Sequence, residues 1–148
     1  MQARVIVRHG DPAKRAKRAP PSLDTSVYIL ELAHGRVYVG KSAHPAARIH
    51  QHFTKIGASF TRAFPPTGRR LPRLGNVSGA GDAAERDETL RYMHLRGIGN
   101  VRGWRYTAET LSHADYLDAE RNIRELFDLC RRCGRRGHFA AECPVKAG

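Results

Sequence analysis

VYILELAHGRVYVGK, at residues 27–41, is the stretch that decides the fold. Two runs rich in β-branched and aromatic residues, 26–32 and 36–41, flank Ala-His-Gly, and this pattern predicts a β-hairpin. A three-residue loop at 33–35, with Gly35 in the left-handed conformation, would place Tyr28 opposite Gly40. Because alternate residues share a face of a strand, Tyr28 and Tyr38 should then lie side by side.

The two faces of this hairpin differ in composition. One carries Val27, Ile29, Val37 and Val39, and we expect it to be the core. The other carries the two tyrosines, with Lys41 at its edge. Taken alone, such a phenol pair is more often a packed aromatic pair than a chemical site.

Length and charge narrow the function. The 148 residues suffice for one compact domain with a small appendage, and the net charge of +12 indicates a polyanionic partner such as nucleic acid. Residues 32–81 contain no acidic residue, which makes this half a candidate phosphate-binding face. No apolar run approaches the roughly 20 residues of a membrane span, and the N-terminus lacks a signal-peptide core. We therefore expect a soluble intracellular protein with no membrane partner.

All three cysteines lie near the C-terminus, in the pattern C-x2-C-x4-H-x4-C formed by Cys130, Cys133, His138 and Cys143. Three thiolates and one imidazole complete a tetrahedral shell, which suits one structural Zn²⁺ and leaves no open catalytic position. The alternative is a disulfide with one spare thiol. The spacing resembles the retroviral-type zinc knuckle, which binds single-stranded nucleic acid by stacking bases among basic residues. The knuckle residues expected to bind are Arg131, Arg132, Arg135, Arg136 and Phe139.

The remaining segments suggest a small α+β domain between two appendages. Residues 1–25 read as a flexible basic arm, in which KRAKR is either a nuclear-import signal or a solvated charge run. Helices are expected at 44–57, 82–95 and 112–129, and a short third strand at 73–79. Capping patterns support two of them: Asp82 with Glu85 as a capping box, and Ser112 as an N-cap. The predicted units are residues 1–25, 26–129 and 130–148.

Several ordered motifs resemble the GIY-YIG nuclease family. They are Val27-Tyr28, Tyr38-Val39-Gly40, Arg48 on the following helix, and Asn100 in Asn-Val-Arg-Gly. The resemblance implies a three-stranded antiparallel sheet flanked by helices, and cleavage of phosphodiester bonds with one Mg²⁺ or Mn²⁺ held by a single glutamate. It also implies catalytic roles for the matching residues, including Asn100.

Two glutamates compete for the metal. Family spacing favours Glu85, and helical geometry places Glu85 on the face of Thr89, Tyr92 and Met93. Glu88 falls on the wetter side of the same helix. Glu85 could instead serve only in the capping box, and the two roles compete.

The chemistry assigns roles to the remaining residues. Arg48 can clamp the non-bridging oxygens of the phosphate. Tyr28 is the first choice to activate water and Tyr38 to orient it, although family similarity does not settle their division of labour. Because a free phenol has a pKa of about 10, Lys41, the metal or His52 must favour its ionised form or relay its proton. His52 could also be an ordinary surface histidine. Further nucleic-acid contacts are expected from Lys41, Arg48, Lys55, Arg62, Arg69, Arg70 and Arg102.

The prediction is a metal-dependent endonuclease acting on nucleic acid, with DNA favoured over RNA. It would be nuclear if the source is eukaryotic, and a separate protein could supply target recognition. The alternative is a non-catalytic nucleic-acid-binding or annealing protein on the same scaffold, which charge and the zinc tail fit equally well. The joint presence of Tyr28, Tyr38, Arg48, Glu85 and Asn100 argues for the enzyme, because binding alone does not require them. The oligomeric state stays open.

Overall fold

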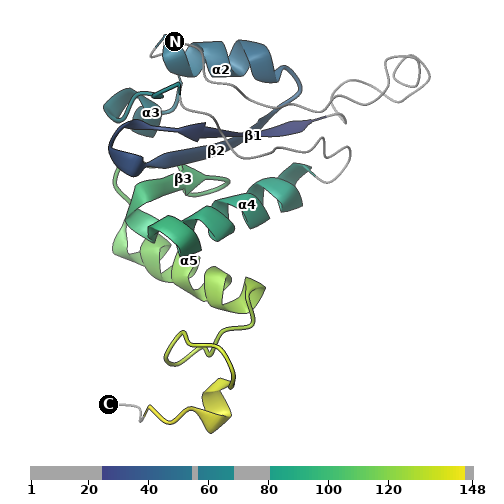
Figure 1. The fold of residues 1–148 in the computed structure, drawn as a ribbon, viewed down its shortest axis with the longest axis vertical. Helices are drawn as coiled ribbons and strands as arrows, with labels where there is room; N and C mark the ends of the chain where they lie inside the picture. Colours follow the sequence, from purple (N-terminus) through teal and green to yellow (C-terminus); the bar gives the residue numbers. More distant parts are fainter. Residues whose placement is uncertain (1–24, 55–56, 69–80, 146–148) are drawn as a thin grey trace, which may run out of the picture.

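A computed structural model describes residues 25–54, 57–68 and 81–145 (Figure 1). Its strands are β1 (Ser26–Glu31), β2 (Val37–Ser42) and β3 (Val101–Gly103), and its helices are α2 (Pro45–Phe53), α3 (Ser59–Ala63), α4 (Gly81–Arg96) and α5 (His113–Leu126). Short 3-10 turns occupy Ala33–Gly35, Ile98–Asn100 and Ala140–Glu142. Figure 1 shows α2 and α3 on one side of the sheet and α4 on the other, with α5 beyond α4 and the C-terminal segment beyond α5. The predicted basic arm, the predicted strand at 73–79, and Lys55, Arg69 and Arg70 lie outside the described residues.

The hairpin has the predicted register. Tyr28 pairs with Gly40, and Leu30 pairs with Tyr38. The loop residues His34 and Gly35 both have positive φ, 63° and 72°, and the Leu32 N–H donates to the Arg36 carbonyl at 2.7 Å. Glycine adopts this conformation without strain, which is why the chain can reverse here in three residues.

The sheet is mixed, so the expected purely antiparallel arrangement is wrong. The strand order is β1-β2-β3, and β2 pairs antiparallel with β1 but parallel with β3. Parallel neighbours need a long crossover connection. The chain between β2 and β3 supplies one, because it passes through α2, α3 and α4.

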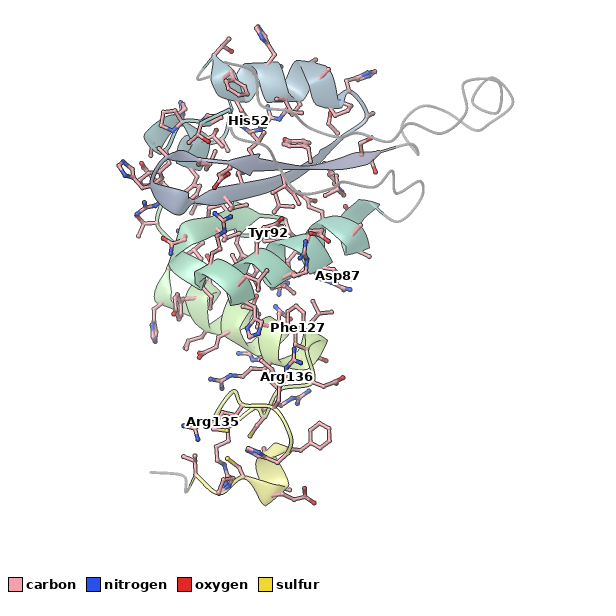
Figure 2. All side chains as sticks on the ribbon, viewed as in Figure 1. His52, Asp87, Tyr92, Phe127, Arg135 and Arg136 are labelled. Atoms are coloured by element: carbon pink, nitrogen blue, oxygen red, sulfur yellow. The ribbon has the colours of Figure 1, made fainter. Side chains whose placement is uncertain are left out.

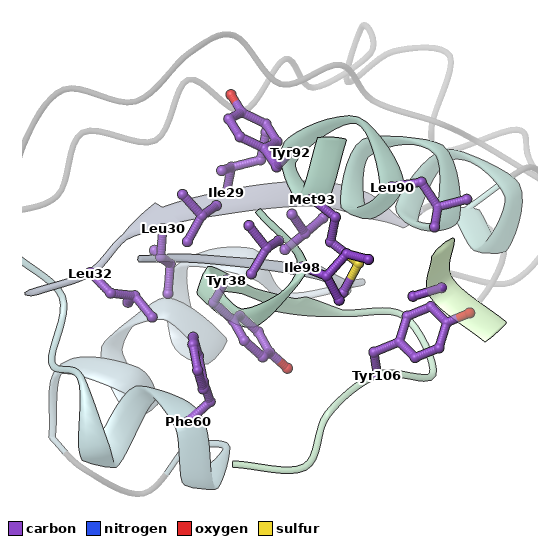
Figure 3. Packing of buried hydrophobic residues seen from close by; sticks show 14 of the residues in the cluster. Ile29, Leu30, Leu32, Tyr38, Phe60, Leu90, Tyr92, Met93, Ile98 and Tyr106 are labelled. Carbon is purple, nitrogen blue, oxygen red and sulfur yellow. The ribbon is translucent and has the colours of Figure 1, made fainter. Parts of the chain in front are cut away.

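Both faces of the hairpin are buried, which corrects the expectation of a single core face. Val27, Ile29 and Val39 are buried as predicted, but Tyr28 and Tyr38 are buried too. Figure 3 shows Ile29 and Met93 on the α4 side of the sheet, and Tyr38 and Phe60 on the opposite side. A helical layer on each side therefore makes the tyrosine face a second interior.

Helix α2 buries His52, at 1% exposure, and Ile49 also packs against the core. Pro45 occupies the first turn of the helix, and Ala46 is exposed. A histidine with two hydrogen-bond partners can be buried without an unsatisfied polar atom. His52 is therefore an interior residue and not a surface histidine.

The other helices differ in how they begin. Ser112 caps α5 as predicted, with its side chain accepting a hydrogen bond from the Asp115 N–H at 3.1 Å. Helix α4 begins at Gly81, so Asp82 lies inside its first turn and not at the N-cap position where it was expected. Among the described residues, no helix combines the length and apolar character that crossing a bilayer requires.

Candidate active site

Tyr28 lies against Gly40 of the neighbouring strand. A Cβ atom added at Gly40 would overlap the hydroxyl and ring of Tyr28. The cross-strand pairing of the two residues explains this closeness, since the phenol occupies the space that a side chain would fill. Glycine is therefore the only residue at this position that leaves the Tyr28 hydroxyl where it is.

A buried chain of hydrogen bonds joins Tyr28 to α2 and α3. The Tyr28 hydroxyl lies 3.0 Å from Nε2 of His52, and Nδ1 of His52 lies 2.9 Å from Oγ1 of Thr61. The Thr61 hydroxyl donates its single proton to the Ala58 carbonyl at 2.9 Å, so its oxygen must accept from Nδ1 of His52. A neutral His52 then carries its proton on Nδ1, and its Nε2 accepts the proton of the Tyr28 hydroxyl.

The surroundings favour neutral forms of these groups. Burial, with a smaller contribution from the charge of Arg48, lowers the pKa of His52 from 6.5 to about 4. Burial raises the pKa of Tyr28 and of Tyr38 above 10.0, while the charge of Arg48 opposes the rise in both. At neutral pH the site therefore holds a neutral imidazole, whose Nε2 lone pair accepts from Tyr28, and two protonated phenols.

Arg48 reaches this site from α2, one helical turn before His52. Its Nη1 donates to Oε1 of Gln51 at 2.7 Å, and its charge acts on Tyr28, Tyr38 and His52 alike. The Tyr38 and His52 rings lie 4.8 Å apart between centroids. Figure 2 shows His52 between α2 and the sheet. Arg48, His52 and the two tyrosines thus form one cluster.

Glu85 is the buried carboxylate of α4, at 9% exposure. Burial raises its pKa, whereas the charge of Lys41 and a backbone hydrogen bond from Trp104 lower it in part. Lys41 Nζ lies 3.9 Å from Oε2 of Glu85 and also pairs with Asp82. Lys41 therefore faces α4 rather than the tyrosine face on which it was expected.

Glu88 has a different environment. Its Oε2 accepts from Nη2 of Arg91 at 2.8 Å, an ion pair along the partly exposed side of α4. The charge of Glu85, in contrast, raises the pKa of both Tyr28 and Tyr38. Of the two glutamates, Glu85 is the one whose charge acts on both Tyr28 and Tyr38.

Glu85 and the tyrosines approach one another although they start from opposite faces of the sheet. Strand β3 ends at Gly103, which pairs with Val39, so none of the described residues pairs with Gly40 or Lys41 on that side of β2. Groups from α2, β2 and α4 can therefore approach one another at this end of β2. A single carboxylate with a solvent-facing edge fits a Mg²⁺ or Mn²⁺ ion, which keeps several of its waters.

Two predicted site residues lie elsewhere. Asn100 precedes β3, whose first residue pairs with Val37 at the far end of β2, and its side-chain amide donates to the Arg96 carbonyl at 2.8 Å. Arg102 is buried, at 3% exposure, and donates to the Ala108 and Val101 carbonyls at 2.7 and 2.8 Å. Both side chains brace loops through backbone carbonyls, and neither is presented to a phosphate at the tyrosine cluster.

The C-terminal segment forms a compact ligand group. One ligand atom from each of Cys130, Cys133, His138 and Cys143 lies within 4.8 Å of all the others, which fits a zinc ion. The Arg132 N–H donates to Sγ of Cys130 at 3.3 Å. Gly134 and Gly137 have positive φ, 75° and 95°, a conformation that glycine adopts without strain. The turns at these glycines bring the four ligands together.

The side chains expected to bind nucleic acid at the knuckle are accessible. Arg131, Arg132, Arg135 and Arg136 are exposed or partly exposed, and Phe139 is 66% exposed. Figure 2 places Arg135 and Arg136 near the junction with α5, at the opposite end of the molecule from His52. Arg62, on α3, is also exposed. A nucleic-acid strand that contacts both the knuckle arginines and the region around His52 must therefore cross the length of the domain.

Sequence reasoning missed three residues of the site. Thr61 fixes the His52 tautomer, and Gly57 lies so close to this ring that a Cβ there would overlap Nδ1. Trp104, with a φ of 51°, offers its backbone N–H to Glu85. The sequence offered only the pair Gly103-Trp104, which suggests a tight turn but does not indicate that this turn lies beside Glu85.

A family model described as the GIY-YIG catalytic domain matches residues 25–79. A second model, the zinc knuckle, matches residues 128–145. Residues 25–79 are thus similar to the GIY-YIG catalytic domain and residues 128–145 to the zinc knuckle, as the sequence motifs indicated. No curated protein and no solved structure matches the chain.

Proposed function

We propose that this protein is a metal-dependent endonuclease that hydrolyses phosphodiester bonds in nucleic acid, with DNA favoured over RNA. The observation that carries the proposal is the hydrogen bond between the Tyr28 hydroxyl and Nε2 of His52, buried beside Arg48 and within the field of Glu85. A packed aromatic pair would not need an acceptor nitrogen held in one tautomer. General-base catalysis does need one.

Tyr28 would activate the attacking water in concert with His52. Because burial raises the pKa of Tyr28, a free phenolate is scarce at neutral pH. The hydroxyl instead gives its proton to Nε2 of His52 as its oxygen takes a proton from water. The resulting hydroxide attacks phosphorus, and no free phenolate has to accumulate.

The remaining groups would handle the negative charge. Arg48 would bind the non-bridging oxygens, since its guanidinium lies beside both phenols. Glu85 would hold one Mg²⁺ or Mn²⁺, which supplies Lewis-acid stabilisation to the phosphate and the departing 3′ oxygen. Tyr38 would orient the water. Lys41 would keep Glu85 ionised until the cation binds, because its charge lowers the pKa of that carboxyl.

The zinc knuckle would contribute binding rather than chemistry. Its closed ligand set leaves no position for a substrate, while Phe139 and the four arginines offer a stacking face and positive charge. We infer that it holds a single-stranded segment of the nucleic acid. Target recognition by a separate protein would fit the same arrangement.

Incubation of the full chain with matched single- and double-stranded DNA and RNA tests the proposal, in Mg²⁺, Mn²⁺ or EDTA. Cleavage of at least one substrate that requires the divalent ion supports it. Binding without cleavage under every condition would assign the protein to the class of non-catalytic nucleic-acid-binding proteins.

A further inference from the structure

A cavity of about 320 Å³ opens beside the hairpin loop, away from the groups used in the proposed reaction. Its lining includes Arg36, Phe64, Arg102, Leu111 and Tyr116. Arg102 pairs across the parallel strands with Tyr38, so the floor of the cavity lies one strand away from a residue of the tyrosine cluster. The function described above makes no use of this cavity.

Two guanidinium groups and one exposed carboxylate, that of Glu109, line the cavity, so positive charge is in excess there. The Arg36 guanidinium lies 3.9 Å above the centre of the Phe64 ring, and that of Arg102 lies 4.6 Å from the centre of the Phe60 ring. Burial, and then the charge of Arg36, lowers the pKa of Arg102 from 12.5 to about 10. Within the part of the chain that the structure describes, neither arginine has an ion pair with a carboxylate. An anion in the cavity would therefore relieve the repulsion between two neighbouring cations.

The rest of the lining suits a flat aromatic group. The Tyr116 side chain is 44% exposed, and Leu111 adds an apolar wall. Rings and guanidinium planes are the surfaces on which unstacked nucleobases rest in single-strand-binding proteins. A ligand that combines an aromatic ring with a negative charge matches both features of the site.

We propose that this cavity binds one nucleotide of a nucleic-acid strand, with its base against Tyr116 and Leu111 and its phosphate toward Arg36, while the buried Arg102 adds its charge but keeps its hydrogen bonds to backbone carbonyls. This inference rests on the proposed function in one respect, namely that the bound nucleic-acid strand continues from the tyrosine cluster. The pocket then fixes the position of the strand relative to Tyr38. A free nucleotide has the same chemistry, so the experiment must separate the two sources.

Photo-crosslinking of the full chain tests this in buffer without added Mg²⁺ or Mn²⁺ and without a chelator, so that cleavage lacks its divalent ion while zinc stays on the knuckle. A single-stranded oligonucleotide with 5-iodo-2′-deoxyuridine at successive positions is irradiated with the protein, and labelled residues are mapped by mass spectrometry. We expect labelling of Tyr116, with Phe139 of the knuckle as an independent second site. Free 5-iodo-2′-deoxyuridine monophosphate forms the second arm, and preferential labelling of Tyr116 by it would assign the pocket to a free nucleotide.

Two variants make the test specific. Gly99 lines the cavity, and a Cβ there meets nothing within 4 Å, so Gly99→Leu should fill the space without a clash at Cβ. Labelling of Tyr116 should fall on the order of tenfold, while that of Phe139 stays unchanged. Arg36→Gln should reduce the same label, whereas Arg121→Gln, an equal charge change at an exposed position of α5, should not. Thermal melting checks that each variant is folded.

Labelling of Phe139 alone, or equal labelling of Tyr116 in the parent and in Gly99→Leu, would overturn the proposal. Neither result depends on cleavage. If the parent protein is inactive but Tyr116 is still labelled, the pocket proposal stands and the nuclease proposal fails. If the parent cleaves nucleic acid but Tyr116 is not labelled, the nuclease proposal stands and the pocket proposal fails.

Discussion

The hydroxyl of Tyr28 and Nε2 of His52 lie 3.0 Å apart in the interior between the sheet and α2. This hydrogen bond has a fixed direction, because Thr61 already holds the other nitrogen of the ring. A residue that looked like one of several helix histidines is thereby the hydrogen-bond acceptor for the Tyr28 hydroxyl. Because burial lowers the pKa of His52, the stability of the folded protein should depend on pH.

Stability should fall as the pH decreases from about 6.5 to about 4. The pKa of His52 is lowered to about 4 in the folded state, so in this window the unfolded chain binds a proton that the folded chain does not. His52→Gln removes this contribution. Denaturant unfolding at several pH values should show the difference between parent and variant shrinking toward low pH, and a constant difference would mean that His52 does not titrate as described.

Thr61→Val should lower activity on the order of ten- to hundredfold. The methyl group cannot accept from Nδ1 of His52, so the ring loses the partner that keeps Nε2 free for Tyr28. Thr61→Ser keeps the hydroxyl and should retain most of the rate. Equal rates for the two variants, measured under single-turnover conditions, would remove the tautomer from the mechanism.

Gly40→Ala should displace Tyr28. The added methyl group would overlap the phenol, at a stability cost of about 1–3 kcal/mol and with loss of cleavage. Gly99→Ala is the matched control for stability, because a Cβ there meets nothing within 4 Å. Melting curves on both proteins and cleavage assays on Gly40→Ala and the parent decide the point, and a fully active Gly40→Ala protein would show that the position of Tyr28 is not critical.

One zinc per chain should co-purify with the protein. Chelation should unfold the segment that carries Cys130 and Cys143 while the hairpin domain, which has its own core, stays folded. A chain ending after Leu129 should bind single strands with a shallower salt dependence, by about 0.7 for each phosphate that the knuckle neutralises in the full chain. A zinc-free preparation with unchanged affinity would contradict the role of the knuckle.

The local elements of the fold could be predicted because short-range patterns determine them. The hairpin register follows from alternating side chains and a loop glycine, and the knuckle follows from ligand spacing. The direction of β3 could not be predicted, because it depends on where α4 packs. Burial of the tyrosine face could not be predicted either, because it depends on how α2 and α3 pack over that face.

The residues of the candidate site also fall into two groups, those placed by local sequence patterns and those placed only by tertiary structure. Tyr28, Tyr38, Arg48 and His52 cluster because they occupy one hairpin face and one helix turn, which sequence spacing reveals. Thr61 and Trp104 lie on segments whose positions only tertiary structure sets. Asn100 shows the reverse case, a motif residue whose side chain is bound to the Arg96 carbonyl instead of facing the site.

The most direct test of the central claim compares Glu85→Gln with Glu88→Gln. Glutamine keeps the size of each side chain but removes its charge, and only Glu85 lies buried beside Lys41 and within the field of both tyrosines. Metal-dependent cleavage, measured with nucleic-acid binding and melting temperature as controls, should fall by on the order of a thousandfold or more in Glu85→Gln and stay near the parent rate in Glu88→Gln. Binding by Glu85→Gln should persist, because the charge that it removes would repel phosphate. An active Glu85→Gln protein beside an inactive Glu88→Gln protein would contradict the account.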